Sequence, residues 1–175
     1  ELNIHIVENI AKMAKKLVID ILSKEDIIIN LIDLKSYDDY TYRHCLCVAI
    51  LSITMGITLN LNEHMLMEVA MCALLHDLGK MMIPTEITNK PDLLTPEEYD
   101  VMKLHPVIAA NQLRKLHIVS DAVIRGIECH HEKFDGTGYP YGLKGNEIPL
   151  YSKILAVADV YDALTSTRSY RRACF

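Results

Sequence analysis

The stretch that decides the fold and the site reads His130-His-Glu-Lys-Phe-Asp-Gly-Thr-Gly-Tyr-Pro140. Two adjacent imidazoles are followed by two acids, two glycines and a proline. Imidazole and carboxylate groups are common ligands of zinc, iron and manganese. Glycine permits positive φ and proline fixes φ, so Gly136, Gly138 and Pro140 predict a tight, irregular loop. A helix that ends in metal ligands and continues into a rigid loop indicates a catalytic site.

Length and composition predict one helical domain. The 175 residues are enough for a full hydrophobic core, and half of them are hydrophobic. Only 6% are aromatic, so the core consists of Leu, Ile, Val, Met and Ala, a composition that favours helices. The net charge of -5 gives no general attraction to a DNA or RNA polymer. Five cysteines without a Cys-x-x-Cys pair fit a reducing, cytoplasmic compartment.

Apolar side chains recur at helical spacing, and no segment alternates convincingly as a strand does. The expected helices cover residues 3–23, 23–34, 40–55, 62–78, 95–116, 121–131 and 149–163. Gly56 is expected to follow the end of the third helix, Gly79 the end of the fourth, and Pro106 to kink or restart the fifth. Residues 48–59 come closest to a membrane span, but they fall short of about 18 apolar residues.

Acids within apolar helices point to a shared cation. His76 and Asp77 lie in Ala-Leu-Leu-His-Asp-Leu, and Asp159 ends Leu-Ala-Val-Ala-Asp. A carboxylate is rarely buried without a partner, and a metal centre would supply the positive charge that both segments need. Taken alone, His44 is more simply a hydrogen-bonded core histidine, and His105 a partly exposed helix residue.

The pair His76-Asp77, followed by Gly79 and Lys80, resembles the HD superfamily of metal-dependent phosphohydrolases. Together with His-His-Glu-x-x-Asp-Gly-x-Gly-Tyr-Pro, it resembles the HD-GYP subfamily, of the cyclic-di-GMP phosphodiesterase type. The likeness runs from about Tyr42 through Arg172 and includes Lys90-Pro-x-x-Leu-Thr95, His105-Pro106 and Ala158-Asp-x-x-Asp-Ala163. It implies a single HD-type bundle of about seven helices around a dinuclear metal site. Residues 36–175 would form this domain, with its C-terminal end truncated, and residues 1–35 would lead into it or pack on it.

The resemblance implies seven metal ligands: His44, His76, Asp77, His105, His130, His131 and Asp159. Asp77 would bridge two ions, one held by His44, His76 and Asp159 and the other by the remaining three histidines. Five imidazoles and two carboxylates suit iron or manganese better than a thiolate-rich zinc site. Some relatives hold a third ion with a Glu four residues before the first His. Tyr40 stands there, so two ions are expected, although Asp38 and Asp39 keep a third open.

Two ions can hold a bridging hydroxide and bind phosphate oxygens, which is the arrangement for cleaving a phosphodiester. Asp77 and Lys80 would be catalytic. The resemblance implies a phosphodiesterase that hydrolyses cyclic-di-GMP to pGpG, with further hydrolysis to GMP left open. The expected substrate contacts are Lys80, Lys153, Arg168, Tyr170, Arg171 and Arg172. If Lys80 has no functional role, it is an exposed residue just beyond a helix end. In the same way, Arg172 would be part of a solvated basic tail.

Three alternatives stay open. One is a related phosphohydrolase acting on another cyclic dinucleotide or nucleotide, and another is a non-catalytic module that binds a cyclic dinucleotide or a partner. The third is an HD-type di-iron oxygenase, which the Gly-Tyr-Pro loop disfavours. The resemblance also implies a bacterial cytoplasmic signalling module without a membrane span. It would be governed by a sensory or receiver domain outside this chain, with a homodimer left open.

Overall fold

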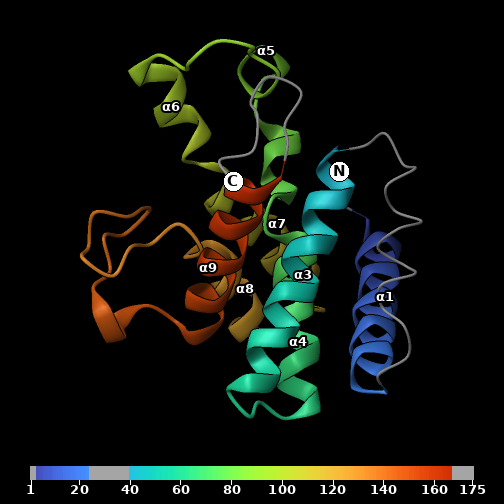
Figure 1. Ribbon diagram of the computed structural model, residues 1–175. Helices are drawn as coiled ribbons and strands as arrows, with labels where there is room; N and C mark the ends of the chain where they lie inside the picture. The colour runs from blue at the N-terminus through green and yellow to red at the C-terminus, as the bar shows by residue number, and fades with distance from the viewer. Residues whose placement is uncertain (1–2, 24–39, 167–175) are drawn as a thin grey trace. The chain divides into compact units, whose positions relative to one another are not determined.

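The computed structural model describes residues 3–23 and 40–166 (Figure 1). These residues form helices and connecting loops without strands, which confirms the all-α prediction. The α-helices are α1 (Ile4–Leu22), α3 (Tyr40–Thr58), α4 (Glu63–Leu75), α5 (Thr85–Thr88), α6 (Pro96–Met102), α7 (His105–Leu116), α8 (Asp121–Glu128) and α9 (Leu150–Thr165). Two 3-10 helices, η2 (Leu78–Met82) and η3 (Gly145–Glu147), lie between them. The helix expected over 23–34 and the C-terminal basic cluster lie outside the described residues, apart from Ser23.

The chain forms two compact units. The first consists of Glu1–Leu74 and Val157–Phe175, and the second of Leu75–Ala156. Helix α9 contributes its first turns to the second unit and its remainder to the first.

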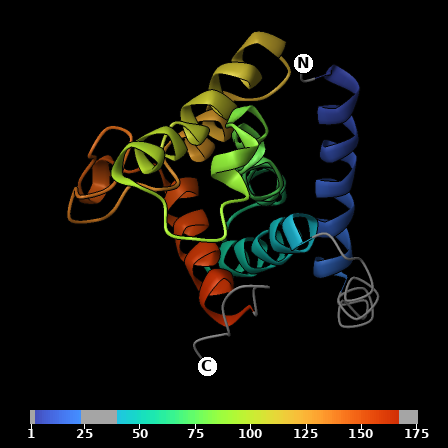
Figure 2. The same cartoon turned by 90° about the horizontal axis from the view of Figure 1, so that it is seen from above.

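The core of the first unit lies between α1, α3 and α4 (Figures 1 and 2). Helical spacing brings Ala14 and Val18 of α1 to the same buried face. They pack with Ile53 of α3 and with Leu66 and Ala70 of α4. Each large apolar side chain buried in this way contributes roughly 1.5–3 kcal/mol to folding.

Helix α3 runs past the glycine that was expected to follow its end. It continues to Thr58, and the chain turns at Asn60, whose φ is 56°. A Cβ at Gly56 would lie 2.7 Å from Cδ2 of Leu66, so the glycine permits α3 to pack closely on α4. The prediction for Gly56 was therefore wrong, because tertiary packing and not the helix end requires a small residue there.

One window of α3, Thr41–Thr58, is long and apolar enough to cross a membrane by length and composition. No such window was predicted from the sequence. A single helix of this kind is weak evidence, because the core helix of a soluble protein passes the same test. Val48, Ala49 and Ile53 of this window are buried within the protein.

Helix α4 ends at Leu75, three residues earlier than predicted. His76 and Asp77 form a turn, and Gly79 lies within η2. A Cβ at Gly79 would collide with the carbonyl oxygen of His105. The absence of a side chain therefore lets η2 pack directly against the start of α7, which brings Asp77 towards His105.

The start of α6 follows the predicted capping box. The Thr95 hydroxyl accepts the Glu98 N–H at 3.2 Å, and the Glu98 carboxylate accepts the Thr95 N–H at 2.7 Å. This helix stops at Met102, and α7 restarts at His105 with Pro106 in its first turn. Proline is tolerated there because a first-turn N–H has no partner within the helix.

Helix α8 begins as predicted, with the Ser120 hydroxyl accepting the Val123 N–H at 3.3 Å. It ends at Glu128, not at the predicted His131. His130 and His131 therefore lie in the turn that follows α8. Because α7 packs against both η2 and α8, the second unit gathers these histidines with His105 and the residues around Asp77.

Candidate metal centre

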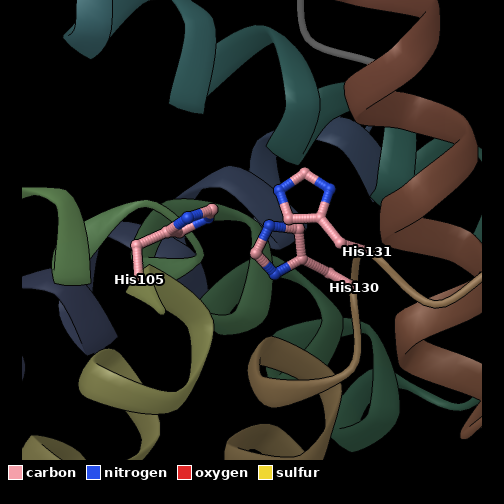
Figure 3. A group of neighbouring side chains, drawn as sticks. All are labelled: His105, His130 and His131. Carbon is pink, nitrogen blue, oxygen red and sulfur yellow. The ribbon is translucent and has the colours of Figure 1, made fainter. Parts of the chain in front are cut away.

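Three imidazoles converge in the second unit (Figure 3). His105 is the first residue of α7, and His130 and His131 follow the end of α8. One ring nitrogen from each lies within 4.8 Å of those of the other two. This spacing is compact enough for a single cation to be contacted by all three side chains.

Backbone carbonyls determine the tautomers of two of these rings. Nδ1 of His105 lies 2.8 Å from the Met102 carbonyl oxygen, and Nδ1 of His130 lies 2.6 Å from that of Ile127. A carbonyl oxygen can only accept, so Nδ1 carries the proton in both rings. The lone pair is then on Nε2, the arrangement in which a histidine binds a metal ion.

Those two Nε2 atoms are buried and have no hydrogen-bond partner among the described residues. Leaving a buried acceptor unsatisfied costs about 1–3 kcal/mol. A divalent cation between the rings would satisfy both lone pairs, so the residues present fit a metal site.

Both rings are neutral at physiological pH. Burial, followed by the positive charge of Lys80, lowers the pKa of His105 to about 4. Burial and the neighbouring His131 and His76 rings hold the pKa of His130 well below its usual value. A metal ion therefore meets imidazoles that need not lose a proton.

Asp77 places an anionic carboxylate beside these rings. Its Oδ1 lies 3.5 Å from Nε2 of His105, and its Oδ2 lies 3.4 Å from Nε2 of His76. Oδ2 also accepts a hydrogen bond from Nζ of Lys80 at 2.7 Å. Burial alone would raise the pKa of Asp77, but His76 and Lys80 together hold that pKa well below its usual value. The second unit thus assembles four imidazoles, a carboxylate and an ammonium group.

The first unit contains a histidine–carboxylate cluster of its own. Nδ1 of His44 lies 2.6 Å from Oδ2 of Asp162, and Nε2 lies 3.2 Å from Oδ1 of Asp159. A carboxylate at Nδ1 leaves Nε2 to face a metal, which is how metal-binding histidines are commonly oriented. The pairing of His44 with Asp162 was not predicted from the sequence, because the two residues are 118 positions apart.

The two acids of the opening motif organise the loop. The buried carboxylate of Glu132 accepts the N–H of Tyr141 at 2.7 Å and that of Leu143 at 3.0 Å. Asp135 accepts both the N–H and the hydroxyl of Thr137. The predicted irregular loop is thus held by carboxylates as well as by its glycines.

Tyr139 lies directly against one of the imidazoles. Its ring stacks on His131 with centroids 4.8 Å apart and planes inclined by 30°. A Cβ at Gly138 would collide with the backbone of Glu132 and Lys133, so only glycine permits this loop to fold back so closely. The Gly-Tyr-Pro segment therefore contacts the candidate centre through a side chain.

The predicted site residues are distributed over both units. Five proposed ligands, His76, Asp77, His105, His130 and His131, belong to the second unit, and His44 and Asp159 belong to the first. Lys153 is partly buried in α9. The remaining predicted substrate contacts, Arg168, Tyr170, Arg171 and Arg172, and also Asp38 and Asp39, lie outside the described residues. The assignment of seven ligands to two ions stays a prediction.

The sequence and the fold were compared with those of known proteins. A family model described as an HD domain matches residues 6–175. Over 152 residues, 87% of this chain, it is 40% identical to a cyclic di-GMP phosphodiesterase of Pseudomonas aeruginosa, of which it covers 37%. It is 38% identical, also over 152 residues and 87% of its length, to a 3'3'-cGAMP-specific phosphodiesterase of Vibrio cholerae, of which it covers 35%.

A solved structure has the same fold. An HDG"Y"P protein from Bdellovibrio bacteriovorus superposes with a TM-score of 0.78 at 25% sequence identity. The superposition covers 93% of this chain and 53% of the other. The chain therefore spans about half of this structural relative and little more than a third of the curated ones.

Proposed function

This chain belongs to the HD-domain family, and from that premise we propose that it is an HD-GYP phosphodiesterase. Its substrate would be cyclic-di-GMP, which it hydrolyses to pGpG and then to GMP. The observation that supports this most strongly is the pair of buried Nε2 atoms of His105 and His130 beside the anionic Asp77. The names of the similar curated proteins supply the substrate class.

The proposed cofactors are two divalent ions, iron or manganese, which suit a donor set of imidazoles and carboxylates without thiolates. Following the sequence resemblance, one ion is assigned to His105, His130 and His131. The other is assigned to His44, His76 and Asp159, with Asp77 shared. When bound, such ions supply Lewis acidity toward phosphate oxygens and lower the pKa of water.

Lys80 is the proposed catalytic cation. Its ammonium group pairs with Asp77 at 2.7 Å while 40% of its side chain stays exposed, so a substrate phosphate can still reach it. A fixed positive charge here would offset the negative charge that grows on the phosphate oxygens as the P–O bond breaks. The carboxylate of Asp77 holds this ammonium group beside the proposed ligands.

The remaining assignments rest on sequence. Contacts with the dinucleotide are proposed for five residues: Lys153, Arg168, Tyr170, Arg171 and Arg172. The guanidinium groups of the three arginines can bind phosphates in a bidentate manner and stack on bases, and the ammonium group of Lys153 offers a point charge. We also propose a cytoplasmic location and control by a sensory or receiver domain. The matched curated proteins, which extend well beyond the aligned region, fit that arrangement.

The test is a turnover assay on protein loaded with iron(II) or manganese(II). Wild-type protein should release pGpG and then GMP from cyclic-di-GMP. The Asp77→Ala variant should lose both bound metal and turnover. Lys80→Met should keep its metal content and lose about 10²–10³-fold in kcat, as expected for one preorganised charge. Wild-type protein that binds two ions and leaves the substrate intact would contradict the proposal and favour a non-catalytic binding module.

One of the similar proteins points to 3'3'-cGAMP as a second candidate substrate. The 3'3'-cGAMP-specific relative aligns over as many residues as the cyclic di-GMP phosphodiesterase does, at nearly the same identity. Parallel assays with cyclic-di-GMP and 3'3'-cGAMP on the same preparation distinguish the two. A higher kcat/KM for 3'3'-cGAMP would assign the chain to that substrate instead.

A further inference from the structure

One buried carboxylate of the second unit lies outside the proposed ligand set. Glu128 is the last residue of α8, two positions before His130, and only 2% of it is exposed. A carboxylate is rarely buried this fully unless several donors compensate for its lost hydration. The donors that contact the Glu128 carboxylate therefore show how its burial is compensated.

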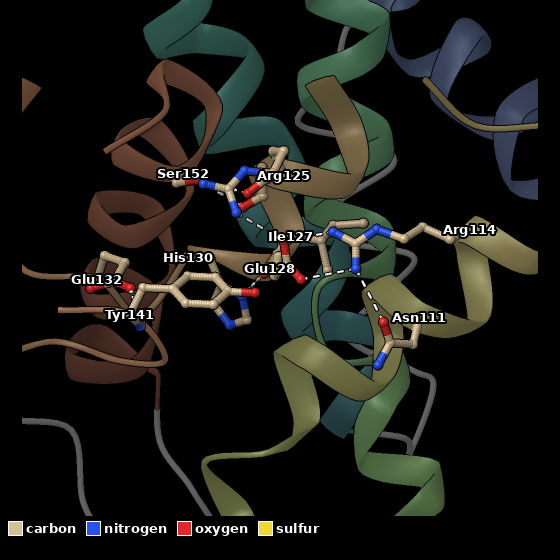
Figure 4. A network of polar contacts seen from close by, with 10 residues as sticks. Asn111, Arg114, Arg125, Ile127, Glu128, His130, Glu132, Tyr141 and Ser152 are labelled. Atoms are coloured by element: carbon tan, nitrogen blue, oxygen red, sulfur yellow. Dashed lines mark hydrogen bonds and ion pairs between the residues drawn. The ribbon is translucent and has the colours of Figure 1, made fainter. Parts of the chain in front are cut away.

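Three segments of the second unit supply those partners (Figure 4). Arg114 of α7 makes a two-pronged contact, with Nη1 at 2.9 Å from Oε1 and Nη2 at 2.7 Å from Oε2. Arg125 of α8 adds a contact of 3.0 Å to Oε2. The hydroxyl of Tyr141, from the loop after Pro140, also hydrogen-bonds the carboxylate. One carboxylate thus joins α7, the last turn of α8 and the loop.

The same turn of α8 orients a proposed metal ligand. The carbonyl of Ile127, immediately before Glu128, accepts the proton on Nδ1 of His130 at 2.6 Å. The backbone N–H of His130 points to the same carbonyl at 3.4 Å. Any rotation of this turn would therefore rotate the imidazole and move its Nε2 atom.

The preceding carbonyls of α8 are held as well. The Ser152 hydroxyl lies 3.2 Å from the Arg125 carbonyl and 3.1 Å from the Gly126 carbonyl. Ser152 holds the backbone just before Ile127, and Glu128 holds the residue just after it. The carbonyl that sets the His130 tautomer is thus fixed from both sides.

We propose that Glu128 is a positioning residue of the metal centre: held by Arg114, Arg125 and Tyr141, it fixes the last turn of α8 so that Ile127 presents Nε2 of His130 to the metal. This inference rests on the proposed function only in requiring that the histidine cluster binds a metal. Glu128 itself coordinates nothing.

The deciding measurement is the affinity for cobalt(II), obtained by competition with a chelator, together with the visible absorption spectrum of the bound cobalt. Glu128→Gln keeps the side-chain shape and removes the charge. Its cobalt affinity is expected to fall about 10–100-fold, the usual effect of losing a group that orients a ligand. Arg114→Lys keeps the charge but not the two-pronged geometry, and it should lose less affinity.

The matched control is Glu98→Gln. Like Glu128, Glu98 forms an ion pair: its carboxylate lies 2.6 Å from Nζ of Lys90. Both glutamates belong to the second unit. The contacts of Glu98 are with Lys90 and with Thr95 of the α6 capping box, and no hydrogen bond or ion pair among the described residues joins it to the turn after α8. It should lose stability while keeping the wild-type cobalt affinity and spectrum, which separates positioning from general stabilisation.

Each outcome decides the inference. A folded Glu128→Gln protein with wild-type cobalt affinity and spectrum would overturn it and leave the proposed function standing. If that variant does not fold, the cobalt affinities of Arg114→Lys and Tyr141→Phe test the inference instead. Wild-type cobalt affinity in both of these variants would overturn it. Wild-type protein that binds cobalt but hydrolyses no cyclic dinucleotide contradicts only the proposed function. Wild-type protein that binds no metal contradicts both.

Discussion

At the scale of single residues, the groups that are hydrogen-bonded to Nδ1 orient the histidines of the candidate site. A backbone carbonyl occupies this position at His105 and His130, and the carboxylate of Asp162 occupies it at His44. In each ring this leaves Nε2 as the atom that can bind a metal. The groups that orient the ligands are thus as much a part of the candidate centre as the imidazoles.

Asp162→Asn tests this at His44. An amide at this position binds Nδ1 more weakly than the carboxylate does, so the ring is held less firmly. The affinity for one of the two proposed metals should fall about 10–100-fold. Metal titration followed by elemental analysis measures it, and Asp100→Asn, at an exposed ion pair with Lys103, is the control. Equal affinities in the two variants would show that Asp162 does not orient His44.

At the scale of elements, the position of the site depends on close approach between helices. Gly79 allows η2 to pack on the start of α7, and Gly56 allows α3 to pack on α4. The two glycines differ in what they face. Gly79 faces the rigid backbone of His105, whereas Gly56 faces the flexible end of the Leu66 side chain.

Gly79→Ala should therefore damage both stability and the site. Overpacking against backbone costs about 1–3 kcal/mol, and the displaced start of α7 moves His105. Urea unfolding and metal titration measure the two effects. Gly56→Ala is the comparison, because Leu66 can shift; it should lose less stability and no metal affinity. A Gly79→Ala variant that binds metal as tightly as wild type would show that η2 does not position His105.

Thr95→Ala addresses the start of α6. It removes the hydroxyl that accepts the Glu98 N–H, and the loss of an N-cap costs about 1 kcal/mol. Chemical denaturation should show this decrease. Metal affinity should stay unchanged, because no hydrogen bond or ion pair among the described residues joins Thr95 or Glu98 to the histidine cluster. Unchanged stability would mean that the capping box contributes nothing to folding.

At the scale of the whole molecule, buried polar groups couple the proposed metals to stability. The folded chain encloses imidazole nitrogens that lack partners among the described residues, and bound cations would satisfy them. A ligand that binds only the folded state adds about 2.7 kcal/mol at a concentration 100 times its Kd. Metal content should therefore govern the melting temperature.

Calorimetry on the whole chain tests this coupling. Manganese(II) should raise the melting temperature in a concentration-dependent way, and a chelator should reverse the rise. Asp77→Ala should show little response, because it lacks the carboxylate proposed to bind both ions. If manganese, iron and cobalt all leave the melting temperature of the wild-type protein unchanged, metal binding does not stabilise the fold.

Local sequence determined the features whose partners lie within a few residues. The all-α fold and the starts of α6 and α8 were predictable, because Thr95 and Ser120 cap helices through groups three positions away. The types of the candidate ligands were predictable too, because acids and histidines within apolar helices need compensating charge. A resemblance of motifs was sufficient to suggest the family.

Tertiary structure alone decided what depends on distant segments. The need for glycine at positions 56 and 79 and the group that orients His44 both follow from contacts with other parts of the chain. Glu128 shows this most clearly, since its sequence neighbours give no sign that Arg114 and Tyr141 would meet it. A helix cap is satisfied locally, whereas a buried charge is satisfied only by whichever donors the fold brings to it.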